Sequence, residues 1–398
     1  MFQITWAMIM LASGTFTTLF AKALYETKGE GDLYCNMDDD TDKNCTFDKP
    51  WFTVFLMKIS MSFCLVAYYG FGWGKDNPDI PNPTWKTIKA VALPASLDLL
   101  NTVLGNVGLL WVNSSIYQMT RGSVVIFSAI LGVKWLGRKL RSFHYMAIAA
   151  VIVAVILVGA AGIEQKAEAD DDGSGSDSDV GMVIVGLGFI LAGQGVTAVQ
   201  FTVEESLMNN PETALDAVAL VGYEGLWGLL FFAILAPILS STPRSEEDIS
   251  IVWHEDFNDT FVQLSNSQDL VLLCFGYFIT IFFYNVSANF VTQCLSAVVR
   301  SILEACRVMG VWAVGLILFY AGNSSYSKVG EEWSNWSFLE LFGFGILLYG
   351  TFAYKALIKM PCVGEEVYEL AIKDEVEFEA KKLGDGGASE DLKVDLTI

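Results

Sequence analysis

Residues that carry catalysis or hold metals are scarce in this sequence. It contains two histidines, His144 and His254, and its seven cysteines form no CxxC or other metal-ligand spacing. No catalytic nucleophile, general base or set of metal ligands lies at helical spacing. The sequence therefore does not predict an enzyme, and it predicts no cofactor and no metal site.

Charged residues are also few, at 17% of the chain, whereas 53% of the residues are hydrophobic and the mean hydropathy is +0.45. A soluble domain does not carry so many long apolar runs, so we expect a protein that crosses the lipid bilayer several times. The formal net charge of −21 is concentrated in a few loops and in the tail. It describes the outer faces of the protein, and nucleic acid is not expected as a partner.

Residues 114–141 form the most informative apolar segment. About 20 mostly apolar residues contain a single arginine, Arg121, and a run of that length crosses the hydrocarbon core as a helix. An ionisable group at such a depth is costly unless it faces a partner or a watery cavity, so Arg121 is a candidate functional residue. The segment ends in Arg138, Lys139 and Arg141, which the positive-inside rule places in the cytosol.

Further apolar runs divide the chain into two halves of five spans each. An acidic Gly/Ser/Asp linker, 164–179, separates the first half, 1–163, from the second, 180–358, and an acidic tail follows, 359–398. The first run lacks a basic n-region, so we expect a retained helix and not a signal peptide. The expected spans are residues 2–24, 51–72, 90–112, 114–141, 143–163, 180–205, 216–240, 269–291, 294–320 and 338–358.

Two signals agree on the orientation of these spans. The N-glycosylation sequons lie in loops on the side opposite the basic cluster. We therefore place both termini in the cytosol and those loops in a lumen, where Cys35 and Cys45 are expected to form a disulfide. The expected glycosylation sites are Asn44, Asn258, Asn323 and Asn335.

Five spans per half imply that the second half enters the membrane upside down relative to the first. Such an inverted repeat is typical of secondary transporters. Aligning Asn106 with Asn285 without gaps also aligns Arg121 with Arg300, so Asn, 14 intervening residues and Arg recur in both halves. The expected fold class is an all-α membrane protein with ten transmembrane helices in two inverted five-helix repeats.

Ionisable and amide side chains inside the spans are the candidate substrate-binding residues. They are Asp98, Asn101, Asn106, Tyr117, Gln118, Arg121, Glu224, Asn285, Arg300, Glu304 and Arg307. Spacings of three and four residues place Arg300, Glu304 and Arg307 on one helix face. This stripe either binds or gates a substrate, or it is an internal set of ion pairs that fixes helix packing.

The carboxylates in other spans are candidate partners of these arginines. Asp98 and Glu224 lie at depths similar to that of Arg300, and we expect them to be its counter-charges. They either pair structurally or act on a substrate or a proton. Glu204 and Glu205 lie near the cytosolic end of their span, where each can reach the interface.

Several runs of residues resemble the F-type branch of the solute carrier 35 family (member 6 group), in the drug/metabolite transporter superfamily. They are PASLD (94–98), SSIYQMTRG (114–122), LGRKL (136–140), VEESL (203–207), GYEGLWG (222–228) and residues 285–312. The resemblance covers about residues 4–358. It implies the drug/metabolite transporter fold, with cytosolic termini, a central cavity lined largely by helices 1 to 4 and 6 to 9, and an endomembrane address that is often lysosomal.

We therefore predict a secondary transporter that moves a small organic solute, nucleotide-sugar-like or another charged metabolite, across a lysosomal or Golgi membrane by alternating access. Its expected partners are that solute, the lipid bilayer and, through the buried carboxylates, a proton. The sequence does not determine the oligomeric state. The alternative is a non-transporting membrane receptor or scaffold that acts through its acidic loops and tail and tolerates loss of the buried charges.

Overall fold

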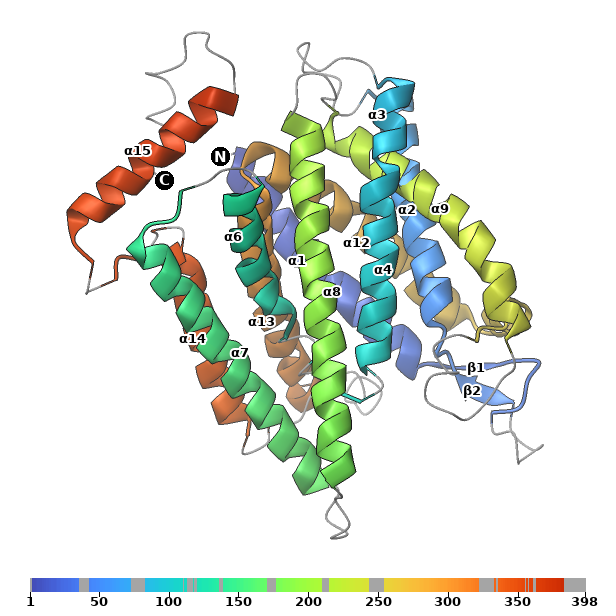
Figure 1. Ribbon diagram of the computed structural model, residues 1–398. Helices are drawn as coiled ribbons and strands as arrows, with labels where there is room; N and C mark the ends of the chain where they lie inside the picture. Colours follow the sequence, from blue (N-terminus) through green and yellow to red (C-terminus); the bar gives the residue numbers. More distant parts are fainter. Residues whose placement is uncertain are drawn as a thin grey trace.

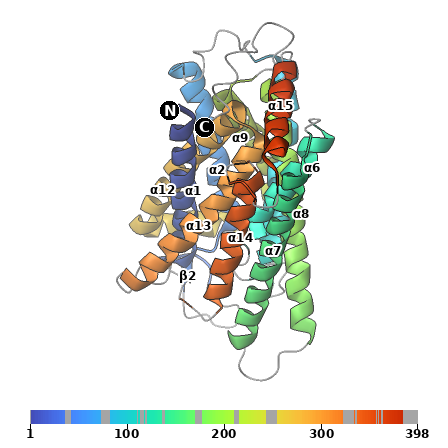
Figure 2. The same ribbon diagram turned by 90° about the vertical axis from the view of Figure 1, so that its left-hand side faces the viewer.

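A computed structural model shows the chain as a bundle of long helices with one small sheet (Figures 1 and 2). It describes residues 2–35, 43–72, 83–109, 111–112, 117, 120–135, 139–169, 177–209, 215–242, 254–321, 333, 336–354, 356, 358–360 and 363–382. The helices are α1 (Phe2–Glu26), α2 (Pro50–Gly70), α3 (Trp85–Ala90), α4 (Ala92–Leu109), the 3-10 turn η1 (Arg121–Ser123), α6 (Val124–Lys134), α7 (Ser142–Ala169), α8 (Asp177–Asn209), α9 (Ala217–Ser241), α11 (Phe257–Asn266), α12 (Gln268–Cys294), α13 (Ala297–Ala321), α14 (Ser337–Tyr354) and α15 (Glu365–Lys382). The strands are β1 (Lys28–Glu30) and β2 (Asn44–Thr46).

Eight helical spans among the described residues are long and apolar enough to cross a membrane. They are formed by α1, α2, α3 with α4, α8, α9, α12, α13 and α14, and their mean hydropathies lie between 1.3 and 2.0. α7 adds a shorter apolar stretch, Ser142–Leu157, and α6 is an apolar helix of 11 residues. The chain is therefore an all-helical, multi-pass membrane protein.

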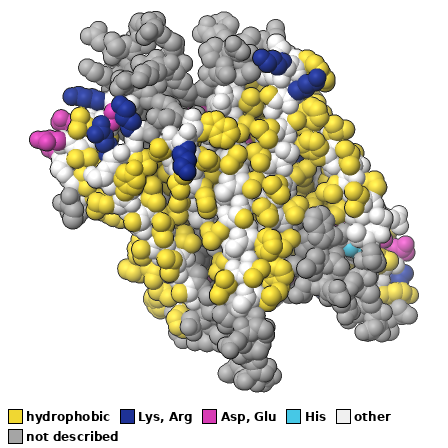
Figure 3. All heavy atoms as spheres, viewed as in Figure 1, with side chains coloured by type: hydrophobic (Ala, Val, Ile, Leu, Met, Phe, Trp, Pro, Cys, Tyr) yellow, Lys and Arg dark blue, Asp and Glu magenta, His cyan; other side chains and the backbone are white. Residues whose placement is uncertain are grey.

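Apolar side chains also cover the outer flank of the bundle (Figure 3). Leu272 and Phe275 on α12 are 67% and 64% exposed, and Ile234 on α9 is 64% exposed. On the face shown, most Lys and Arg side chains lie toward the upper edge of this apolar surface, and another lies at the lower right (Figure 3). A continuous apolar flank bounded by charge is the surface expected of a protein surrounded by lipid.

The two ends of the bundle are built differently (Figure 1). We call one the α15 end, because α1 begins there and α15 lies there, and the other the hairpin end, which carries β1, β2 and α11. β1 and β2 pair in antiparallel fashion, with Gly29 opposite Cys45, and a disulfide joins Cys35 to Cys45. The exposed sequon residues Asn44 and Asn258 lie at this end, whereas Asn323 and Asn335 lie outside the described residues.

α11 holds the hairpin end together through two buried carboxylates. Asp259 accepts hydrogen bonds from the backbone N–H groups of Asp32 (2.8 Å) and Leu33 (3.0 Å) and pairs with Lys49 at 2.8 Å. Glu255, just before α11, accepts hydrogen bonds from two backbone N–H groups in the first turn of α2. We expected residues 241–268 to be a loop, and the helix within them is a correction.

The span expected over residues 114–141 is a shorter helix. A 3-10 turn at Arg121 precedes α6, which ends at Lys134, and residues 113–116, 118–119 and 136–138 lie outside the described residues. Gly122 explains the tight local packing: a Cβ added there would lie 2.8 Å from a methyl group of Leu347 on α14. Arg121 is therefore carried by a turn at the start of the helix and not by its middle.

Helices extend into both ends of the expected linker, 164–179, since α7 reaches Ala169 and α8 starts at Asp177. The acidic tail also contains a helix that we did not expect, α15. Tyr368 on α15 is buried and stacks on Phe143 of α7 with ring centroids 4.6 Å apart. Asp374 of the same helix pairs with Arg141. These contacts dock α15 against the start of α7.

The main helix packing pairs join the two halves of the chain. α1 packs against α12 and α13, and α4 packs against α8 and α9. α2 packs against α9 and α12, and α7 packs against α14. α6 packs against α8 and α13. The helices of the first half thus interleave with those of the second around a central space.

Candidate functional site

A cavity of about 590 Å³ lies between the two halves of the bundle. It extends from Asp48 and Pro50 at the hairpin end to Glu224 and Arg300 in the middle of the bundle. Ten of the eleven candidate substrate-binding residues line it, and Gln118 lies outside the described residues. The lining candidates are Asp98, Asn101, Asn106, Tyr117, Arg121, Glu224, Asn285, Arg300, Glu304 and Arg307.

Lys58 on α2 is fully buried and forms an ion pair with the carboxylate of Asp98 on α4. A glycine of α9 makes room for the lysine stem: a Cβ at Gly228 would lie 2.5 Å from Cδ of Lys58. We expected Asp98 to pair with Arg300 and did not consider Lys58, although Lys58 lies in an apolar span as Arg121 does. A charged side chain inside an apolar span needs a partner or a watery cavity, and this rule alone identifies Lys58 as a candidate.

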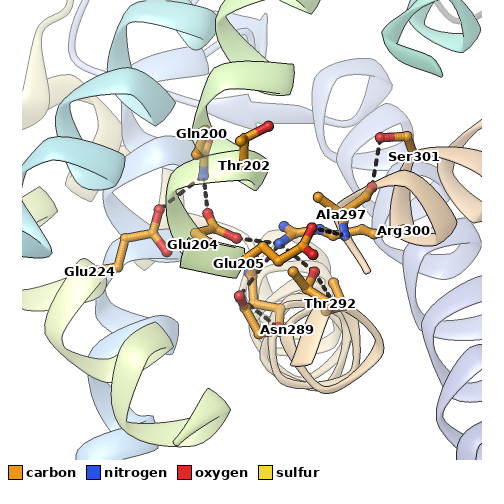
Figure 4. Close-up of polar contacts among 12 residues, drawn as sticks. Gln200, Thr202, Glu204, Glu205, Glu224, Asn289, Thr292, Ala297, Arg300 and Ser301 are labelled. Atoms are coloured by element: carbon orange, nitrogen blue, oxygen red, sulfur yellow. Dashed lines mark hydrogen bonds and ion pairs between the residues drawn. The ribbon is translucent and has the colours of Figure 1, made fainter. Parts of the chain in front are cut away.

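Arg300 on α13 pairs with Glu204 on α8, and both side chains are almost fully buried (Figure 4). The guanidinium also lies over the ring of Phe201, with the guanidinium carbon 3.9 Å from the ring centroid. Our expectation that Asp98 and Glu224 pair with Arg300 was thus wrong, as was the placement of Glu204 at the interface. Depth along separate helices does not specify how each helix is rotated, and rotation decides which groups meet.

Two further contacts join α8 to its neighbours (Figure 4). The side-chain amide of Gln200 donates to Glu204 (2.8 Å) and to Glu224 on α9 (3.0 Å). Glu205, which is also buried, accepts a hydrogen bond of 2.8 Å from the backbone N–H of Ala297 at the start of α13. A carboxylate there interacts favourably with the helix dipole. α8, α9 and α13 are therefore linked by one polar network at the inner end of the cavity.

The remaining residues of the α13 stripe form a second ion pair. Arg307 Nη2 lies 3.0 Å from Glu304 Oε2, and Tyr284 on α12 donates its hydroxyl hydrogen to the other oxygen of Glu304. Arg307 also donates to the backbone oxygen of Gly14 (3.2 Å) and to Thr18 Oγ1 (2.9 Å) on α1. The stripe on α13 is thus partly structural, because each of its charges has a partner.

Arg121 differs from these paired arginines. It is half-buried, it lies over the ring of Tyr117 with a separation of 5.8 Å, and no carboxylate of the described residues lies within ion-pair distance of it. A cation over an aromatic ring in a cavity can bind a carboxylate or phosphate of a solute. Arg121 thus differs from Arg300 and Arg307 in having no ion pair among the described residues.

Comparisons with known proteins identify relatives of this chain. Residues 115–321 match the family described as SLC35F, solute carrier family 35. A Schizosaccharomyces pombe protein, named uncharacterized protein C12G12.12, is 32% identical over 271 residues, which is 68% of this chain and 75% of that one. Human solute carrier family 35 member F6 is 28% identical over 369 residues, and the mouse protein of the same name is 27% identical over 361 residues; each match covers 89% of both chains. The chain therefore belongs to the SLC35F family, a membrane transporter family within solute carrier family 35.

Proposed function

We propose that the protein is a secondary transporter that moves a small charged organic solute across an endomembrane by alternating access. The observation that carries the proposal is the cavity of about 590 Å³, which lies among membrane-spanning helices and is lined by charged and amide side chains from both halves of the chain. A cavity of that volume suits one small organic molecule. Buried charges at this depth are otherwise expensive, and a watery binding site accounts for them.

The helix packing supports the proposed division into two inverted five-helix repeats. We match α1, α2, α4, α6 and α7 in order with α8, α9, α12, α13 and α14. Exchanging the halves then turns the α1–α12 pair into the α8–α4 pair, and the α6–α8 pair into the α13–α1 pair, and all four pairs occur. The α2–α9 and α7–α14 pairs map onto themselves. A pseudo-two-fold relation of this kind accompanies alternating access in many transporters.

The two ends of the cavity support a gating role for the polar network. The cavity reaches Asp48 and Pro50 at the hairpin end, whereas the Glu204–Arg300 pair and the Glu205 contact tie α8 to α13 beyond its inner end. We infer that the cavity is open toward the hairpin end and closed toward the α15 end. Passage of the solute then requires α8 and α13 to separate.

The proposed address is a lysosomal or Golgi membrane with the hairpin end in the lumen and both termini in the cytosol. A disulfide and two exposed sequon residues at the hairpin end support this orientation, because disulfides and glycans belong to lumenal surfaces. Lys139 and Arg141 lie at the opposite end, as the positive-inside rule requires of a cytosolic surface.

The test begins with a thermal-shift screen of the full-length protein against defined metabolites, among them nucleotide sugars, nucleotides, dicarboxylates and organic cations. Ligand binding to the folded state raises the melting temperature. The stabilising compound is then offered to proteoliposomes, where the protein should accumulate it and Arg121→Gln should reduce uptake by at least roughly tenfold, the loss of one charge-assisted contact. Lys89→Gln, an exposed lysine of α3 outside the cavity, should transport normally. Stabilisation without uptake would support the receptor alternative, and uptake unaffected by Arg121→Gln would remove Arg121 from the site.

A further inference from the structure

Glu224 is a buried carboxylate at the inner end of the cavity. Its side chain is 1% exposed, yet it lines the cavity that reaches the hairpin end. Its hydrogen-bond partner is the amide of Gln200 at 3.0 Å, and no Lys or Arg of the described residues pairs with it. An ionised carboxylate held in that way inside a membrane protein is strongly unfavourable, whereas a protonated one is not.

The charged groups that face Glu224 are already committed to other partners. From α2, Lys58 pairs with Asp98 of α4, and from α13, Arg300 pairs with Glu204 of α8. Within each of these two ion pairs, the positive and the negative charge cancel. α12 adds only neutral groups to this part of the cavity, Tyr277 and Asn285. Glu224 is therefore the carboxylate of this group whose charge is not balanced.

The amide of Gln200 holds Glu224 close to a second carboxylate. Its nitrogen donates one hydrogen to Glu204 and the other to Glu224 (Figure 4). A proton on Glu224 removes the repulsion between these neighbouring carboxylates. Arg300 keeps Glu204 ionised, so the proton belongs on Glu224.

The same network holds an unused donor. The Nε of Arg300 is buried and has no hydrogen-bond partner among the described residues. Arg300 also lines the cavity, so a water molecule entering from the hairpin end can accept this hydrogen and reach Glu224. The cavity therefore offers water a path from the hairpin end to Glu224.

We infer that Glu224 is the proton-binding residue of this protein and that solute movement is coupled to one proton per cycle; this inference rests on the proposed transport function. A hydronium ion at the hairpin end transfers its proton to a carboxylate oxygen of Glu224, which forms an O–H bond and leaves a water molecule behind. The neutral carboxyl group is carried through the change of access. On the other side a water molecule takes the proton and the carboxylate re-forms.

Infrared difference spectroscopy of the full-length protein in lipid nanodiscs tests the proton site without any solute. Between alkaline and mildly acidic buffer, the wild type should gain a C=O stretching band of a buried protonated carboxyl group. Glu224→Gln should lack that band, and Glu224→Asp should show it at a shifted position. Glu365→Gln, the same change at an exposed carboxylate that pairs with Lys359, should retain it. Identical spectra for wild type and Glu224→Gln would overturn the assignment.

Folding and transport give two further readouts. Glutamine resembles the protonated carboxyl group, so Glu224→Gln should stay monodisperse; a variant that aggregates at every pH would show that the fold needs the ionised carboxylate, and the assignment would fall. In proteoliposomes that contain a pH dye, the stabilising metabolite should change the internal pH with the wild type and not with Glu224→Gln. Solute movement without a pH change would overturn the coupling. The carboxyl band without any solute movement would leave the proton site standing and overturn the proposed transport.

Discussion

The buried charges of the cavity are arranged mostly as pairs. Lys58 with Asp98, Arg300 with Glu204, and Arg307 with Glu304 each bring opposite charges together across or along helices. Removing one partner of a buried pair leaves the other uncompensated, which is more destabilising than removing both. These pairs therefore contribute to the fold as well as to the site.

The Arg300–Glu204 pair gives the sharpest test of this reasoning. Arg300→Gln and Glu204→Gln should each reduce the free energy of unfolding by about 3 to 5 kcal/mol, because each leaves a buried charge alone. The double variant should recover most of that loss in thermal unfolding measurements. Lys359→Gln breaks a pair whose side chains are 63% and 78% exposed and should leave the melting temperature unchanged. If losses in the two single variants simply add in the double variant, the two side chains do not act as a pair.

Glu255 makes stability depend on pH. Burial raises the pKa of Glu255 to about 7, and this effect outweighs the two backbone N–H donors from α2 that favour the ionised form. In the unfolded chain, the carboxyl group of Glu255 loses its proton near pH ~4.3. The folded state binds this proton more tightly than the unfolded chain. The stabilisation from Glu255 is therefore fully present below about pH 4.3 and is lost as the pH rises toward about 7, by at most about 4 kcal/mol.

The melting temperature of the purified protein should therefore fall between about pH 4.5 and about pH 7, and Glu255→Gln should flatten that slope. Glutamine keeps an acceptor for the α2 backbone without titrating. Glu369→Gln, which removes an exposed carboxylate of α15, serves as a control for the loss of one charge. Equal slopes for wild type and Glu255→Gln would show that another group is responsible.

Sequence reasoning found the residues that line the cavity and not their partners. Arg121, Arg300 and Glu224 are recognisable because each interrupts an apolar span. The free-energy cost of burying such a charge depends only on the composition of the span and on its depth in the membrane. Pairing depends on helix rotation and on close approach, as at Gly228, where the stem of Lys58 crosses α9. Neither helix rotation nor the close approach of two helices can be read from one sequence, because the neighbouring helices determine both.

At the scale of elements, the long apolar helices were predictable and the polar ones were not. α9 starts after Asp216, which caps it by accepting from the N–H of Val218 at 2.8 Å, and an apolar run follows. α11 and α15 carry no such run. Both gain their order from contacts with distant segments, such as Asp259 with the hairpin and Tyr368 with α7.

Docking of α15 should depend on Tyr368. Its ring stacks on Phe143, and its hydroxyl oxygen accepts a hydrogen bond of 2.7 Å from the backbone N–H of Met360. Tyr368→Ala should weaken docking by about 3 kcal/mol, which corresponds to roughly 100-fold faster limited proteolysis near the start of α15. Ile372→Ala removes an exposed side chain of the same helix and should leave the cleavage rate unchanged. Unaltered cleavage in Tyr368→Ala would mean that the ring does not hold α15 in place.

At the scale of the whole molecule, the orientation can be tested with glycans. In a glycosylation-competent host, Asn44 and Asn258 should both carry a glycan. Asn44→Gln and Asn258→Gln should each remove one glycan, which is measured as faster migration on a gel. A new sequon made in the tail by Gly387→Asn, which precedes Ala388 and Ser389, should stay unmodified. A glycan at this new site would reverse the proposed topology.

Alternating access is the central claim, and side-specific thiol labelling tests it directly. The background carries alanine at the buried Cys64 and Cys274 and serine at Cys294, Cys306 and Cys362, and single cysteines are introduced by Asn101→Cys in the cavity or Ala297→Cys at the closed end. Ala297 is 2% exposed. In sealed vesicles of known orientation, a membrane-impermeant maleimide should label Asn101→Cys from the hairpin side, and should label Ala297→Cys, more slowly, from the α15 side only. If Ala297→Cys stays unlabelled in the membrane from both sides, yet reacts fully after denaturation, the closed end does not open and the protein does not work by alternating access.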